Sequence, residues 1–176
     1  TADDLKLPTP DLRARADCAR AAEAVVIAPS EDLREFVASL GERAEDVRRG
    51  AVRPEEDNML VITGDGRKAA LDMRLVPHAA TRSAVEVPTK IEVAAARIHR
   101  IWAEHRDRPY LDGHGHPSPA PGALQIVFCD LGTPSQRWNA YDELKTQLAG
   151  HGMDPARVRF VHEATKDSQK AELFAA

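Results

Sequence analysis

The sequence predicts an α/β fold with a parallel sheet, and two observations lead to that class. Short apolar runs typical of buried strands occupy residues 24–28 and 124–129, and residues 157–162 are predicted to be a third strand. Segments with apolar residues at helical spacing lie between these runs. Strands that are joined by helical crossovers form a parallel sheet. We therefore expect a parallel sheet with additional helices.

The first predicted strand leads directly into a predicted helix. The β-branched run 24–28 is closed by Pro29, and Ser30 is placed to cap the helix that follows. Gly50 is expected to end this helix. One face of the helix holds apolar residues at helical spacing, namely Leu33, Phe36, Val37, Leu40, Ala44 and Val47.

The stretch 30–106 is predicted to be mostly helical. Gly64-Asp65-Gly66 is a turn signal, and Asp65 is placed to cap a helix that runs to about Val76. Thr89 and Glu92 have the spacing of a capping box at the start of an amphipathic helix. Residues 106–122 carry four of the twelve prolines, three glycines and two histidines, so they are predicted to be a loop.

The last third of the chain begins with the clearest predicted strand, 124–129. A polar turn follows at 130–135, and then a helix that ends at Gly150. After the third strand, at 157–162, Asp167 is placed to cap a last helix. The inward face of the helix before Gly150 is expected to hold Trp138, Tyr141, Leu144 and Leu148.

Composition limits the classes of protein to which this chain can belong. The 176 residues suffice for one domain, and a hydrophobic content of 43% with 30% charged residues is ordinary for a soluble globular protein. A net charge of −4 excludes a uniformly basic nucleic-acid binder but allows a local basic patch. Cys18 and Cys129 are expected to be reduced. With no secretory signal or membrane span in sight, a cytoplasmic protein without a membrane partner is predicted.

The two ends of the sequence suggest a fragment. The chain begins at Thr1 without a methionine, and Phe174-Ala175-Ala176 lies inside a predicted helix. We therefore expect that these residues belong to a longer protein.

Several sequence runs occur along the chain in a recognisable order. They are Leu7-Pro8, Asp57-Asn58-Met59-Leu60, Asp65-Gly66-Arg67-Lys68-Ala69-Ala70-Leu71-Asp72, Leu71-Asp72-Met73-Arg74-Leu75, Gln125-Ile126-Val127-Phe128-Cys129-Asp130 and Phe160-Val161-His162-Glu163-Ala164-Thr165. Taken in this order, the runs resemble the second RecA-like lobe of Swi/Snf-type superfamily-two helicases. Among these, the greatest similarity is to bacterial and phage helicases that are often fused to adenine-specific DNA methylases.

The resemblance implies an incomplete RecA-like helicase C-terminal lobe. Residues 1–22 would connect two lobes, and residues 23–176 would form part of the second lobe. The parent would be a DNA-dependent ATPase or helicase-type motor that uses ATP and Mg²⁺. This segment would supply part of the DNA groove and of the interface with the missing first motor lobe.

The family's catalytic parts have no counterpart in this sequence. The phosphate-binding loop, the acidic magnesium motif and the arginine fingers are absent from it, and the 64–66 turn lacks the Gly-Lys-Ser/Thr ending of a Walker loop. We therefore expect no catalytic residue and no bound cofactor in this segment alone. The alternative is a non-motor binding or scaffolding fragment from a mobile-element protein.

Candidate nucleic-acid contacts lie at two polar turns. Thr133 and Ser135 follow the second strand, where open α/β sheets bind ligands and a helix N-terminus favours phosphate. Thr165, Lys166 and Lys170 have the same relation to the last helix. The alternative is that the hydroxyl groups only cap the helices that follow them.

A basic helical face is the other candidate contact. Arg67, Lys68 and Arg74 would cluster on one side of a helix, as phosphate neutralisation requires. Neighbouring Asp65 and Asp72 could neutralise them instead. His114 and His116 do not suggest a zinc site, because two histidines without a third ligand at suitable spacing are a poor one.

The sequence also predicts self-association. In the resembled lobe, a further strand would lie beside residues 124–129, and this chain ends before reaching it. The 124–129 strand would then be an exposed sheet edge, which can pair with another chain.

Overall fold

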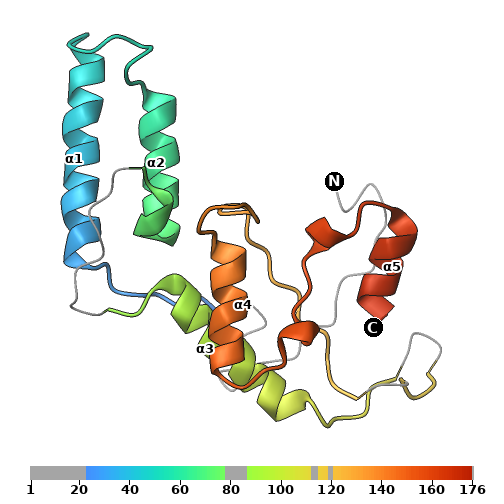
Figure 1. Cartoon of the computed structure of the whole chain (residues 1–176). Coiled ribbons are helices and arrows are strands. Elements are labelled where there is room, and N and C mark those ends of the chain that lie inside the picture. Colours follow the sequence, from blue (N-terminus) through green and yellow to red (C-terminus); the bar gives the residue numbers. More distant parts are fainter. Residues whose placement is uncertain (1–22, 78–86, 112–114, 119–120, 176) are drawn as a thin grey trace.

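A computed structural model describes residues 23–77, 87–111, 115–118 and 121–175 (Figure 1). These residues form five α-helices and three short 3₁₀ turns, and they contain no β-strand or sheet. The only backbone pairing of β type among them is an isolated bridge between Leu111 and Pro117. The predicted α/β fold is therefore wrong for the described residues, while the proposed lobe connection at 1–22 lies outside them.

The first two helices form an antiparallel hairpin on one side of the molecule (Figure 1). α1 spans Glu31–Arg48, and the Ser30 hydroxyl caps it by accepting a hydrogen bond from the Leu33 amide at 3.2 Å. α2 spans Met59–Leu71 and is capped by Asn58, whose side-chain oxygen accepts from two backbone amides of the first turn. The predicted cap of α1 is confirmed, but α2 begins before the glycine pair that predicted a turn.

The third and fourth helices pack against each other and form the main core. α3 spans Lys90–His105, and its predicted capping box between Thr89 and Glu92 is confirmed. α4 spans Ala140–Gly150, so the predicted end at Gly150 is also confirmed. The core between them consists of buried Ala95, Leu148 and Met153, covered by half-buried Ile98, Trp102, Leu144 and Val158.

Short turns and one more helix complete the described chain. η1 covers Met73–Leu75 directly after α2, and η2 and η3 cover Pro155–Arg157 and Val161–Glu163. α5, Asp167–Ala175, lies at the C-terminal end, apart from the hairpin in Figure 1. No helix among the described residues is long and apolar enough to cross a membrane.

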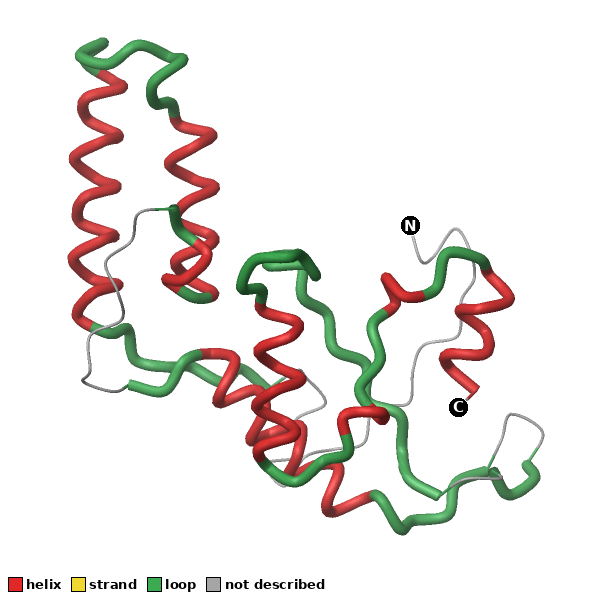
Figure 2. Tube along the Cα trace, viewed as in Figure 1, coloured by secondary structure: helices red, strands yellow, loops and turns green. Residues whose placement is uncertain are grey.

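The three predicted strands are loops or turns instead (Figure 2). Residues 24–28 and 124–129 are unpaired, and the run 157–162 is interrupted because η2 ends and η3 begins within it. A strand is stabilised by hydrogen bonds to a neighbouring strand. The described residues offer no such neighbour to any of the three segments, which is why their β-prone composition does not produce a sheet.

The backbone turns at Gly132, where a hydrogen bond holds the chain against the start of α4. Gly132 has a φ of 64°, and its carbonyl accepts a hydrogen bond from the Ala140 amide at 3.0 Å. A Cβ atom at this position would lie 2.9 Å from the Ala140 Cβ and 3.2 Å from Leu75 Cδ2. Glycine is thus required here both by backbone conformation and by space.

We expect Gly132→Ala to lower the free energy of unfolding by about 2 kcal/mol, because the left-handed conformation and the close contacts both disfavour a side chain. Gly64→Ala is the matched control, since Gly64 lies inside α2 with no atom within 4 Å of an added Cβ. It should stabilise the chain by up to about 1 kcal/mol. Urea denaturation measures both, and equal effects would contradict the account of the turn.

Candidate nucleic-acid interface

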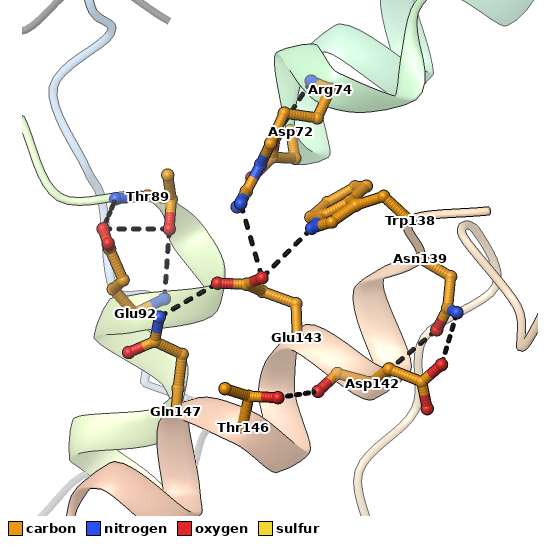
Figure 3. Close-up of polar contacts among 10 residues, drawn as sticks. All are labelled: Asp72, Arg74, Thr89, Glu92, Trp138, Asn139, Asp142, Glu143, Thr146 and Gln147. Atoms are coloured by element: carbon orange, nitrogen blue, oxygen red, sulfur yellow. Dashed lines mark hydrogen bonds and ion pairs between the residues drawn. The ribbon is translucent and has the colours of Figure 1, made fainter.

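Arg74 is the most enclosed of the predicted cationic contacts (Figure 3). Its guanidinium forms a two-bonded pair with Asp72, with Nε–Oδ1 at 2.9 Å and Nη2–Oδ2 at 2.8 Å. The Asp72 side chain is only 3% exposed. Hydrogen bonding to Asp72 raises the pKa of Arg74 above its ordinary value. This cation already has its anion, so it is not available to a phosphate.

The same guanidinium reaches α4. Its Nη1 lies 3.4 Å from Glu143 Oε2, and its central carbon lies 4.1 Å from the centre of the Trp138 ring. The Trp138 indole donates to Glu143 Oε2 at 3.0 Å, and Gln147 donates to the other carboxylate oxygen at 2.9 Å. Burial raises the pKa of Glu143, but these two hydrogen bonds and the Arg74 charge outweigh it, so the pKa is lowered overall.

The other two cations of the predicted basic face, Arg67 and Lys68, turn toward different acids. Arg67 pairs with Asp130 across an exposed 2.8 Å contact, and Lys68 lies 3.8 Å from Asp65. Together with Arg74, they therefore do not form one cluster directed at a ligand. The alternative of a neutralised, ion-paired face agrees with these contacts.

Asp65 has a second partner that sequence reasoning missed. Arg43 of α1 donates two hydrogen bonds to Asp57, at 2.7 and 2.9 Å, and one to Asp65 at 3.1 Å. Hydrogen bonding to Asp57 raises the pKa of Arg43, and hydrogen bonding to Arg43 lowers the pKa of Asp57. The arginine thus joins α1 to the start and the middle of α2. Arg43 follows Phe36 by seven residues and Leu40 by three, so it lies beside the apolar face of α1, but this spacing alone did not identify its long-range partners.

The loop before α4 keeps Thr133 and Ser135 at the surface. Asn139, and neither of these hydroxyl groups, caps α4 by accepting from the Asp142 amide at 2.9 Å. The Ser135 hydroxyl donates to the Arg137 carbonyl at 3.2 Å, whereas the Thr133 side chain makes no hydrogen bond within the described residues. Both residues are accessible, but the predicted capping alternative is wrong for them.

The start of α5 brings several donors to one point. The Thr165 amide, the Thr165 hydroxyl and the Lys166 amide all donate to Gln169 Oε1, at 3.0, 3.1 and 3.1 Å. Lys166 is exposed, and Lys170 forms an exposed pair with Asp167 at 3.2 Å. Asp167 lies in the first turn of α5 and pairs with Lys170. The Gln169 side chain accepts hydrogen bonds from the two amides that precede the helix.

The eight predicted contacts lie in three separate places. Arg67, Lys68 and Arg74 belong to the α2–η1 segment, and Thr133 and Ser135 belong to the loop before α4. Thr165 and Lys166 directly precede α5, and Lys170 lies within it. Figure 1 shows α2 and α5 well apart, with α4 between them in this view. Of the three places, only the start of α5 combines an exposed lysine, Lys166, with converging donors.

A metal centre finds no support in the described part of the chain. No group of three or more His, Cys, Asp or Glu side chains there could hold a metal ion. His99 and His151 stack with ring centres 5.3 Å apart, which is a packing contact between α3 and the end of α4. Of the two histidines in the Pro/Gly-rich loop, His114 lies outside the described residues.

No protein-family model matches the chain, and no significantly similar curated protein or solved structure is found.

We expect Arg74→Met to lower the free energy of unfolding by about 3 kcal/mol, because it leaves the buried Asp72 carboxylate without its cation. Arg67→Met is the matched control. It breaks a pair whose side chains are 60% and 85% exposed, so it should cost less than about 1 kcal/mol. Chemical denaturation compares the two variants, and a loss of equal size would mean that the Arg74 pair is not structural.

Proposed function

We propose that this chain is a non-catalytic, DNA-contacting segment of an ATP-driven DNA motor, and that its contact with the DNA backbone is made at the start of α5. The similarity of its residue runs to Swi/Snf-type helicases supports the motor assignment. The convergence of three donors on Gln169 Oε1, beside two lysines, is the observation that carries the DNA contact.

A phosphate oxygen can take the place that Gln169 Oε1 occupies. Both are oxygen acceptors, and the charged phosphate forms stronger hydrogen bonds with backbone amides than a neutral amide does. The partial positive charge of the helix N-terminus adds to this preference. Lys166 and Lys170 supply the positive charge that neutralises a phosphate, and the exposed pair of Lys170 with Asp167 is weak enough to exchange.

The proposal assigns ATP hydrolysis to the rest of the motor. Phosphoryl transfer requires a phosphate cradle, a held magnesium ion and positioned cations. Arg74 and Arg43, the most strongly held cations described above, are both committed to internal carboxylates. The parent protein would bind ATP and Mg²⁺ with its first motor lobe, and this segment would hold DNA.

A scaffolding segment without a motor partner is the second candidate. The observation that favours it is the number of large apolar side chains left at the surface, such as Leu60 and Phe128. Such side chains are typical of surfaces that bind other proteins. This function requires neither DNA nor ATP.

DNA binding by this chain should be weak, independent of sequence and lost as salt rises. Lys166→Glu combined with Lys170→Glu removes two phosphate contacts, so the log–log salt slope should fall by about 2. Arg34→Glu combined with Arg48→Glu on α1 changes the net charge equally and should leave the slope nearly unchanged. Fluorescence anisotropy with two unrelated duplexes provides the measurement. A loss confined to one duplex would contradict backbone contact.

The chain alone should not hydrolyse ATP above the buffer rate, with or without DNA, because it lacks the catalytic groups. Tethered to the first motor lobe of a Swi/Snf-type helicase, it should support DNA-stimulated hydrolysis, measured as phosphate release. The control is the first lobe alone. ATP hydrolysis by the untethered chain would overturn the proposal, and a tethered form no more active than the control would favour the scaffolding function.

A further inference from the structure

Residues 124–128 present an apolar row to solvent. Leu124, Ile126, Val127 and Phe128 are 64%, 58%, 50% and 92% exposed. The intervening Gln125 turns inward, and its side-chain amide donates to the Ile98 carbonyl of α3 at 3.1 Å. At the end of the segment, the Cys129 carbonyl accepts from the Tyr141 hydroxyl of α4 at 2.5 Å. The segment is therefore held on α3 and α4 at Gln125 and Cys129, while its large apolar side chains are exposed.

The backbone of this segment is also unpaired. No backbone group from Ala123 to Cys129, apart from the Cys129 carbonyl that Tyr141 occupies, has a hydrogen-bond partner among the described residues. The side chains themselves favour β-structure, because Ile126, Val127 and Phe128 are β-branched or aromatic. An apolar segment whose N–H and C=O groups have no partner among the described residues is a template for pairing with another strand.

We propose that the occupant is a second copy of this chain, whose residues 124–128 pair with the same residues in antiparallel orientation about Ile126. In this register, Leu124 of each copy lies opposite Phe128 of the other copy, and the two Ile126 residues lie opposite each other. Such pairing gives a closed two-fold dimer, because the same surface serves both copies. The proposal is independent of DNA binding at α5.

Charge does not oppose this self-pairing. Residues 121–129 contain no charged side chain, so no like charges face each other across the two copies. Asp130, the first charge beyond the segment, would lie opposite Gly122 and keeps its own partner, Arg67. The other exposed apolar residues lack this combination. Met59, Leu60 and Val61 belong to α2, whose backbone bonds internally. The run 24–28 is also uncharged, but it exposes only two large apolar side chains, Val25 and Val26, and it is followed by Pro29, which has no N–H group to donate.

Sedimentation equilibrium over a range of concentrations tests the dimer. Ile126→Asp places two carboxylates opposite each other at the two-fold axis, so it should raise the dimer dissociation constant by about tenfold or more. Val26→Asp is the matched control, because Val26 is 90% exposed but lies outside the segment, and it should leave the constant unchanged. Helical circular dichroism checks that both variants fold. A chain that is monomeric throughout, or equal effects of the two variants, would overturn the proposal.

Cross-linking tests the register. Residues directly opposite each other in an antiparallel pair have Cα atoms about 4.5–5.5 Å apart, which suits a disulfide. Under mild oxidation, Ile126→Cys should therefore give covalent dimers well above the level of the unaltered chain, which carries Cys18 and Cys129. Leu124→Cys should not, because its two copies would be about 13 Å apart along the strands. Equal cross-linking at 124 and 126 would rule out this pairing.

Discussion

The arrangement of the helices depends on the two-bonded ion pair between Arg74 and Asp72. The main helix packing occurs within two pairs, α1 with α2 and α3 with α4. The short segment after α2 joins them, because Asp72 is buried and fixes Arg74, and Arg74 then reaches Glu143 and Trp138 (Figure 3). A carboxylate that is buried in this way is tolerated only with its cation in place. The ion pair thus serves as the joint between the hairpin and the core.

Features that depend on neighbours in sequence were predictable. The Ser30 cap and the Thr89–Glu92 capping box require residues within one helical turn, and both occur. The end of α4 at Gly150 follows from the same kind of local signal. The beginning of α2 was missed, because Gly64 and Gly66 predicted a turn although Asn58 offered a cap six residues earlier. Helix formation in the hairpin overrides the two glycines.

The sequence predicted a sheet that the described residues do not form, because a strand depends on partners that are distant in sequence. Residues 124–129 have the composition of a buried strand, and that composition alone indicates no neighbour. The prediction of a single basic face failed for the same reason. Arg67, Lys68 and Arg74 are close in sequence, but each has a different carboxylate partner, and Asp130 is 63 residues from Arg67. Charge was evident from the sequence, whereas the direction of each side chain was not.

The two surfaces proposed for this chain depend on opposite physical effects. Phosphate contacts at α5 release counterions, so salt weakens them. Pairing of the uncharged 124–128 segment removes apolar side chains from water, and salt does not oppose that process. A dimer that persists where DNA binding has been lost would therefore be consistent with both proposals, since neither surface shares a residue with the other. The acidic net charge also favours a localised DNA contact, because it opposes a general attraction to DNA and confines the contact to a local cationic turn.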